Sequence, residues 1–253
     1  MENKQPSFID LLLEAHVGLK RQGPGSVEAM KQALGFLEPI KRFEQIADLG
    51  CGTGGQTMLL AEHLTGNITG LDMFPDFINR LKENAKSKGL ENRVTGVVGN
   101  MENLPFEKNF FDLIWSEGAI DNIGFENGLK HWRDFLKQGG YVAVTCPSWI
   151  TKEHPSVVEQ FWADAGSPLE TVEKNIEIMT DSGYGFVAAF VLPEECWTDN
   201  YFSPREVAIQ NLINKYPQSD TVTEYAQMNR HEVELFMKYK QHYGYVFYIG
   251  RAI

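Results

Sequence analysis

The sequence has few of the residues that several common architectures require. Its three cysteines, Cys51, Cys146 and Cys196, are far apart and form no C-x-x-C pair, which argues against a disulfide framework and a zinc ribbon. Its six histidines show neither HExxH nor HxxxH spacing, so we expect no metal ion. Unpaired cysteines suit a reducing compartment, and we therefore expect a cytoplasmic protein.

Basic residues and long apolar runs are also scarce. The chain has 23 Lys and Arg against 34 Asp and Glu, a formal net charge of -11, which repels phosphate backbones and anionic lipid surfaces. The longest uncharged apolar stretch, residues 183–193, is too short to cross a bilayer. Residues 1–16 lack the basic start and long apolar region of a signal peptide. We expect neither nucleic acid nor a membrane as a partner.

Short apolar segments alternate with longer amphipathic ones along the 253 residues, of which 43% are hydrophobic. Gly, Asp or Asn bounds the short segments, and the stretches between them are long enough for crossover helices. The pattern predicts a single α/β domain with a doubly wound, Rossmann-like sheet of seven strands, mostly parallel with the last strand antiparallel, plus a helical cap. The expected strands are 46–49, 68–71, 94–98, 113–116, 141–145, 186–192 and 245–249.

Several helix boundaries follow from local sequence patterns. Apolar residues at 132–136 predict a helix that ends at the glycines 139–140. Ser167 and Ser203 each precede a proline and lie three residues before a glutamate, which is the pattern of a helix start. The sequence therefore predicts two further helices that begin at these serines.

A glycine cluster follows the first expected strand. Residues 46–55 (IADLGCGTGG) run from an apolar strand into glycines that open a helix. Glycines adopt backbone torsions closed to other residues and let a ligand approach the main chain, and the helix N-terminus offers unpaired N–H groups. Gly50, Gly52 and Gly55 match GxGxxG, which by itself is weak evidence for a dinucleotide site.

Two acids beside the cluster narrow the kind of ligand. Asp48 ends the first strand two residues before Gly50, where a carboxylate repels a pyrophosphate and attracts an ammonium group. Asp72 ends the next strand, where its two oxygens can accept both hydroxyls of a ribose. Together these acids favour a ligand that carries a ribose and a positive charge.

Four segments in order resemble the motifs of class I S-adenosylmethionine-dependent methyltransferases: 48–55 (DLGCGTGG), 70–77 (GLDMFPDF), 98–106 (VGNMENLPF) and 110–115 (FFDLIW). The resemblance covers about residues 36–145 and is nearest to the ubiquinone-biosynthesis-like subgroup, which acts on small molecules. It implies S-adenosyl-L-methionine as cofactor, S-adenosyl-L-homocysteine as product, and methyl transfer to a small organic acceptor. With it we divide the single domain into an N-terminal helical cap (1–40), a cofactor-binding core (41–146), and the remaining strands with substrate-side helices (147–253).

The resemblance implies a role for each matching position. Asp48 and the glycine backbone hold the methionine moiety, Asp72 holds the ribose, and Met73 packs on the adenine. Asn100 stands where the family usually has Asp, and its carbonyl oxygen can still accept a hydrogen bond. Apart from the resemblance, Arg21 and Gln22 in the glycine-rich turn 21–26 can reach the ligand carboxylate from a closing N-terminal segment, and the alternative is an ordinary turn between two helices. The cofactor-binding candidates are Asp48, Gly50, Cys51, Gly52, Gly54, Asp72, Met73, Asn100, Met101, Ser116 and Arg21.

Acceptor recognition is expected from residues outside the shared core. Aromatic side chains there suit a pocket for a small organic molecule. Glu117 and Tyr201 are the candidates for a catalytic group, although an activated methyl donor needs no dedicated base when the acceptor is a good nucleophile. The substrate-pocket candidates are Glu117, Trp149, Tyr184, Trp197 and Tyr201.

Other functions stay open at this point. An NAD-linked oxidoreductase would explain GxGxxG and Asp72, but it would leave Asp48 and the segment 98–106 unexplained. A cofactor-binding protein without methyl-transfer activity would keep the same motifs. Each site residue also has a structural alternative, which is helix capping for the acids and core packing for the methionines and aromatics. The oligomeric state, a homodimer included, is left open.

Overall fold

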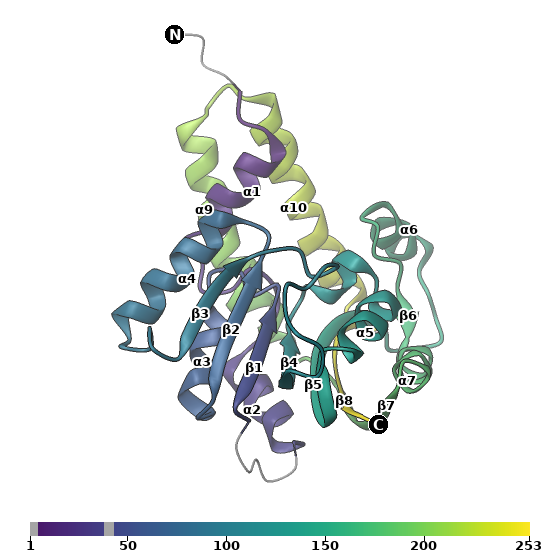
Figure 1. The fold of residues 1–253 in the computed structure, drawn as a ribbon. Coiled ribbons are helices and arrows are strands. Elements are labelled where there is room, and N and C mark those ends of the chain that lie inside the picture. The colour runs from purple at the N-terminus through teal and green to yellow at the C-terminus, as the bar shows by residue number, and fades with distance from the viewer. Residues whose placement is uncertain (1–4, 38–42) are drawn as a thin grey trace.

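A twisted β-sheet forms the centre of the molecule (Figure 1). The computed structural model describes residues 5–37 and 43–253. The strands lie in the order β3-β2-β1-β4-β5-β8-β7, and the short β6 pairs beside this path with β5. The strands are β1 (Gln45–Leu49), β2 (Asn67–Asp72), β3 (Val94–Val98), β4 (Phe111–Ser116), β5 (Leu136–Trp149), β6 (Glu170–Thr171), β7 (Tyr184–Val191) and β8 (Tyr243–Ala252).

The sheet confirms the predicted fold class. All seven expected segments overlap strands of the path. β1 to β5 pair in parallel with their neighbours, whereas β8 runs antiparallel to both β5 and β7. Because the parallel strands share one direction, the turns after β1, β2 and β4 meet at the same edge of the sheet, where ligands bind in doubly wound folds.

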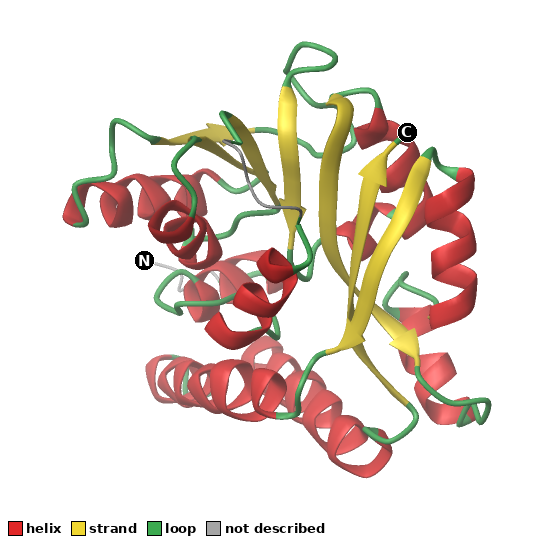
Figure 2. Cartoon of the chain, turned by 90° about the horizontal axis from the view of Figure 1, so that it is seen from below, coloured by secondary structure: helices red, strands yellow, loops and turns green. Residues whose placement is uncertain are grey.

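Helices cover both faces of the sheet (Figure 2). One large apolar cluster joins the sheet to α2, α3 and α4, and to α6, α8, η2 and α10, while a second cluster joins the other face to α5 and α7. The helices are α1 (Phe8–His16), α2 (Val27–Gly35), α3 (Gly55–His63), α4 (Pro75–Ser87), η1 (Ile120–Ile123), α5 (Phe125–Arg133), α6 (Ser156–Asp164), α7 (Val172–Asp181), α8 (Glu195–Trp197), η2 (Thr198–Phe202), α9 (Ser203–Lys215) and α10 (Asp220–Tyr239).

The helix marked by Trp132 exists, but its expected end at the glycines 139–140 is wrong. α5 ends at Arg133, and β5 already begins at Leu136, which pairs with Phe111 of β4. The backbone carbonyl of Phe135 accepts hydrogen bonds from the amides of both residues 110 and 111. Pairing with β4 therefore overrides the local helical pattern. The register between β4 and β5 shifts between Phe111 and Leu113, as at a β-bulge.

Of the two serine-proline helix starts, the one at Ser167 is wrong, whereas α9 does begin at Ser203. α7 begins at Val172, and its N-cap is Thr171, whose hydroxyl accepts from the amide of residue 174. At Ser203 the chain is already helical, because α8 and the π-helix η2 lead directly into α9. The Ser203 hydroxyl donates instead to the carbonyl of Thr198, 2.8 Å away.

Helices from both ends of the chain form the cap above the carboxyl edge of the sheet. α1 packs on α9 and α10 in a separate apolar cluster that includes Leu11, Ile209 and Tyr225 (Figure 1). Of the expected cap (1–40), α1 lies in this cluster, α2 packs on the sheet in the large cluster, and residues 1–4 and 38–40 lie outside the described part. We call residues 17–26, which join α1 to α2, the strap.

Truncating Leu11 tests how far the cap depends on this cluster. Leu11 is fully buried, whereas Ile9 on the same helix is 60% exposed. Leu11→Ala should lower the free energy of unfolding by roughly 2–5 kcal/mol, because it leaves a cavity between α1 and its partners. Ile9→Ala should change it by less than about 0.5 kcal/mol. Urea denaturation measures both, and equal losses would contradict this packing.

Candidate functional site

The turn after β1 has the backbone conformation that its glycines predict. Gly50, Gly52 and Gly54 have φ angles of 71°, 54° and 83°, in the left-handed region that favours glycine. The amides of Gly50 and Cys51 both donate to the carbonyl of Leu71, which ties the turn to the end of β2. The turn then opens α3, whose first backbone amides face the carboxyl edge of the sheet.

Asp72 lies at the end of β2 and binds the turn from the opposite side. Its Oδ2 accepts from the amide of Gly52 and its Oδ1 from the amide of Phe74, each at 3.0 Å. Burial raises the pKa of its carboxyl group. An ionised carboxylate has about four acceptor positions, so two remain for a ligand after these two bonds.

Asp48 lies at the end of β1, where it is 2% exposed. Its Oδ2 accepts a 2.6 Å hydrogen bond from the hydroxyl of Thr57 in α3. Burial, reinforced by the negative charges of Glu117 and Asp72, raises the pKa of Asp48 to about 7. A cationic group placed beside Asp48 would offset both effects, so the site favours a positively charged ligand group.

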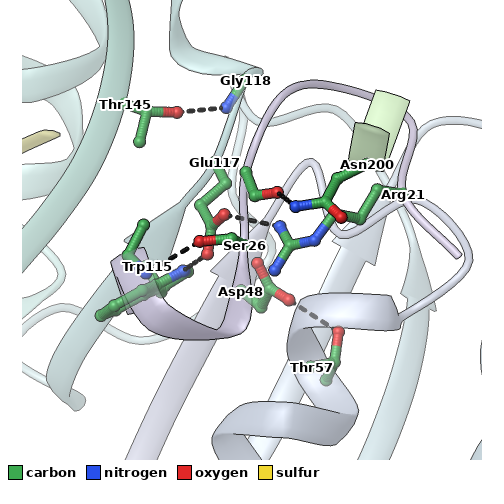
Figure 3. Close-up of polar contacts among 11 residues, drawn as sticks. Arg21, Ser26, Asp48, Thr57, Trp115, Glu117, Gly118, Thr145 and Asn200 are labelled. Atoms are coloured by element: carbon green, nitrogen blue, oxygen red, sulfur yellow. Dashed lines mark hydrogen bonds and ion pairs between the residues drawn. The ribbon is translucent and has the colours of Figure 1, made fainter. Parts of the chain in front are cut away.

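A buried ion pair joins the strap to the end of β4 (Figure 3). Arg21 Nη1 donates to Glu117 Oε2 at 2.8 Å, and Trp115 Nε1 donates to Glu117 Oε1 at 2.9 Å. The two ion-pair side chains are only 8% and 1% exposed. Arg21 Nη2 is buried without a hydrogen-bond partner, so the guanidinium retains a donor for a further acceptor.

Gln22 fastens the strap to the glycine turn. Its Oε1 accepts from the amide of Thr53, and its Nε2 donates to the Thr53 hydroxyl, both at 3.0 Å. A Cβ at Gly52 would lie 2.1 Å from Gln22 Oε1, so glycine at 52 is required for this contact. Further along the strap, Gly25 donates its amide to the Cys196 carbonyl and accepts from the Asn200 side chain.

The adenine-side candidates lie around the ends of β2 and β3. Met73 is 63% exposed. Asn100 Oδ1 accepts from the amide of Glu102, and the carbonyl of Met101 accepts from Trp132 Nε1, both at 2.9 Å. A Cβ at Gly50 would lie 3.9 Å from Met101 Sδ, so Met101 borders the glycine turn.

The acceptor-side candidates are not all brought together. Trp197 and Tyr201 lie in α8 and η2, beside the residues that hold the strap, and Trp149 ends β5 with its ring stacked on His154. Tyr184 begins β7 opposite Ala252, at the other end of the sheet, and its hydroxyl donates to the Leu129 carbonyl. The structure therefore separates Tyr184 from the site, as a core residue.

Hydrogen bonds already occupy three polar candidates. The Ser116 hydroxyl donates to the Leu49 carbonyl, which links β4 to β1. Both oxygens of Glu117 accept hydrogen bonds, and the Tyr201 hydroxyl accepts from Arg205. Burial raises the pKa of Tyr201 to about 12, so its hydroxyl stays protonated.

Sequence reasoning missed Thr57, which positions Asp48, and Tyr245, whose hydroxyl lies beside Gly118. A Cβ at Gly118 would lie 4.0 Å from the Tyr245 oxygen. Neither residue belongs to a recognisable motif. The available signal was the alternation of β8, which puts residues 243, 245 and 247 on one face of the sheet.

Two cavities flank the site. One of about 860 Å³ lies between the strap, α3 and α4, and includes Lys20, Asn84 and Asn200. Another of about 230 Å³ lies on the α5 and α7 side and includes Asp121. In residues 5–37 and 43–253, no three His, Cys, Asp or Glu side chains gather in a way that could hold a metal ion. Every helix in the described part is too short or too polar to span a bilayer.

Comparison with known proteins identifies the region around the glycine turn. Residues 46–140 match the family model described as a methyltransferase domain. The fold of the chain matches that of a solved S-adenosylmethionine-dependent methyltransferase from Geobacter sulfurreducens in complex with S-adenosyl-L-homocysteine, with a TM-score of 0.81 and 16% identity, covering 98% of this chain and 99% of that one.

Two relatives show how far the sequence likeness to other methyltransferases extends. Norajmaline N-methyltransferase of Rauvolfia serpentina is 30% identical over 96 residues, which cover 38% of this chain and 33% of the relative. Phosphoethanolamine N-methyltransferase 3 of Arabidopsis thaliana is 27% identical over 168 residues, which cover 65% of this chain and 33% of the relative. The chain thus spans about a third of the length of each of these relatives.

Replacing Asp48 tests the buried acid next to the glycine turn. Because its pKa is higher in the folded state than its ordinary 3.8, ionising Asp48 destabilises the fold as pH rises from about 4 to about 7. Asp48→Asn should therefore be more stable than the wild type by roughly 2–4 kcal/mol at pH 8 and nearly equal to it at pH 4. Urea denaturation at both pH values measures this. A difference that does not change with pH would contradict the assignment, and the exposed Asp76→Asn provides the control.

Proposed function

We propose that this chain binds S-adenosyl-L-methionine, transfers its methyl group to a small organic acceptor, and releases S-adenosyl-L-homocysteine. The observation that carries the proposal is the convergence of Asp48, Asp72 and Arg21 around the glycine turn. The buried Asp48 favours a cationic ligand group, and Asp72 has free acceptor positions beside the turn. Arg21 keeps an unused hydrogen-bond donor. The match of residues 46–140 to a methyltransferase domain supports it.

The residue types fit the parts of this cofactor. Asp48 pairs with the ammonium group and Arg21 Nη2 with the carboxylate of the methionine moiety, while the backbone of Gly50, Cys51, Gly52 and Gly54 allows close approach. Asp72 accepts the ribose hydroxyls. Met73, Asn100 and Met101 border the adenine, and Ser116 holds the passage to the acceptor through its bond to β1.

The same charges argue against an NAD-linked oxidoreductase. A dinucleotide would place its pyrophosphate beside the glycine turn, within the field of Asp48 and Glu117. Asp48 is buried with a pKa already raised to about 7, and a phosphate would raise it further. A protein that binds the adenosyl cofactor without transferring the methyl group remains the second hypothesis, and turnover with acceptors separates the two.

The cofactor supplies an activated methyl group when it is bound. The chain's own residues then have to orient the acceptor and exclude water. The strap would exclude water, because Arg21 and Gln22 hold it over the turn. Glu117 is held in an ion pair with Arg21, and burial keeps the Tyr201 hydroxyl protonated, so neither candidate is placed to act as a base.

Finer assignments form part of the same proposal. Nearness to the ubiquinone-biosynthesis-like subgroup rests on the sequence motifs alone. The division into a cap (1–40), a core (41–146) and a substrate-side remainder (147–253) rests on the extent of the sequence motifs. The acidic charge of -11 supports a small molecule over nucleic acid as partner. A cytoplasmic location rests on the free cysteines, and a homodimer stays open.

Asp72→Ala tests the proposal at the ribose position. The affinity for S-adenosyl-L-homocysteine should fall well beyond tenfold, since two charge-assisted hydrogen bonds to the ribose are lost. Calorimetric titration measures the dissociation constant. The exposed Asp76→Ala, four residues along the chain, should leave it unchanged. Unchanged affinity of Asp72→Ala would remove the ribose assignment.

A further inference from the structure

The Tyr245 hydroxyl lies at the end of β4, where the strap crosses the sheet. The Tyr245 ring is packed against Trp197, with centroids 5.1 Å apart, and the residue is 6% exposed. A Cβ at Gly118 would lie 4.0 Å from the Tyr245 oxygen and 3.9 Å from Gly23 Cα of the strap. The hydroxyl therefore faces the space next to Gly118, at the edge that holds Asp48 and Glu117.

This hydroxyl has no hydrogen bond within the described part of the chain. By contrast, the hydroxyls of the buried Tyr184, Tyr201 and Tyr248 all have a protein partner. Tyr243, on the same face of β8, has an oxygen that is unpartnered and sealed from solvent, but the oxygen of Tyr245 is not among these sealed atoms. The Tyr245 oxygen is thus both unpaired and accessible, which leaves it available to a bound molecule.

The neighbouring polar groups already have partners within the protein. Both carboxylate oxygens of Glu117 are bonded, to Arg21 and Trp115, and the Tyr201 hydroxyl is bonded to Arg205. Burial and nearby acids raise the pKa of Tyr245 well above its usual value. Its hydroxyl stays protonated, so it can exchange hydrogen bonds with a substrate but does not act as a phenolate base.

We propose that Tyr245 is the substrate-contacting residue that orients the acceptor, and that the acceptor's nucleophile carries an N–H or O–H group. This inference rests on the proposed methyl transfer. An N–H or O–H that donates to the Tyr245 oxygen is held beside Gly118 with its lone pair free for attack. An alkene carbon would leave the buried hydroxyl unpaired, which costs free energy, so the site discriminates against carbon acceptors.

The transfer balances without a base supplied by the protein. The acceptor's lone pair forms the new bond to the methyl carbon, while the carbon–sulfur bond breaks and its electron pair stays on sulfur as a neutral thioether. The acceptor becomes positively charged and loses its N–H or O–H proton to water. Arg21 and Arg205 are already paired with Glu117 and Glu232. Their charges are therefore balanced within the protein, and the aromatic side chains of this region suit this end of the acceptor.

Tyr245→Phe and the matched control Tyr243→Phe test the inference in the full chain. S-adenosyl-L-homocysteine formation is measured with primary amines including benzylamine and ethanolamine, with phenols including p-cresol and catechol, and with the alkene geranyl diphosphate. The wild type should turn over at least one amine or phenol but not the alkene. Tyr245→Phe should lower kcat/KM for that acceptor by about tenfold to hundredfold, and Tyr243→Phe by less than about threefold.

Binding gives a second readout that does not depend on turnover. Both variants should keep the wild-type affinity for S-adenosyl-L-homocysteine, while Tyr245→Phe should bind the accepted amine or phenol at least about fivefold more weakly in the presence of that product. Equal acceptor binding and turnover in Tyr245→Phe and Tyr243→Phe would overturn the role of Tyr245. Turnover of the alkene alone, or of no probe, would overturn the acceptor class. Failure of the wild type to bind the cofactor would instead reject the proposed function.

Discussion

The buried ion pair between Arg21 and Glu117 is the contact on which the site depends. It joins residues 96 positions apart and closes the strap over the carboxyl edge of the sheet. A buried charge is tolerated only when it is paired, so loss of either partner would leave the other uncompensated. Next to the ion pair in the strap, Gln22 accepts from the amide of Thr53, which ties the strap to the glycine turn as well.

The balance of charge inside the site explains which ligand it suits. Asp48, Asp72 and Glu117 bring three carboxyl groups to one edge, and Arg21 neutralises only the last of them directly. The remaining negative potential accounts for the raised pKa of Asp48. A ligand with an ammonium group, ribose hydroxyls and a carboxylate would complement Asp48, Asp72 and Arg21. A pyrophosphate or a nucleic acid backbone would instead add negative charge to an already negative site.

Local signals predicted the core of the fold, and long-range contacts explain the failures. Alternating apolar segments and the glycines at 50–54 located the strands and the turn, because these features act over a few residues. The helix start at Ser167 failed because the chain first pairs as β6 and Thr171 then caps α7. The start at Ser203 is right, but helical turns continue into it from Glu195, so no serine cap forms there. No spacing indicates that Tyr245 lies next to Gly118, because the sheet brings together residues more than a hundred positions apart.

Parallel calorimetric titration with S-adenosyl-L-methionine, S-adenosyl-L-homocysteine and NAD tests the central claim most directly, because it examines the charge of the site before any acceptor is known. The account predicts micromolar binding of both adenosyl ligands, since each carries the ammonium group, carboxylate and ribose that Asp48, Arg21 and Asp72 would bind. It predicts no measurable binding of NAD. Binding of NAD alone, or of none of the three, would contradict it.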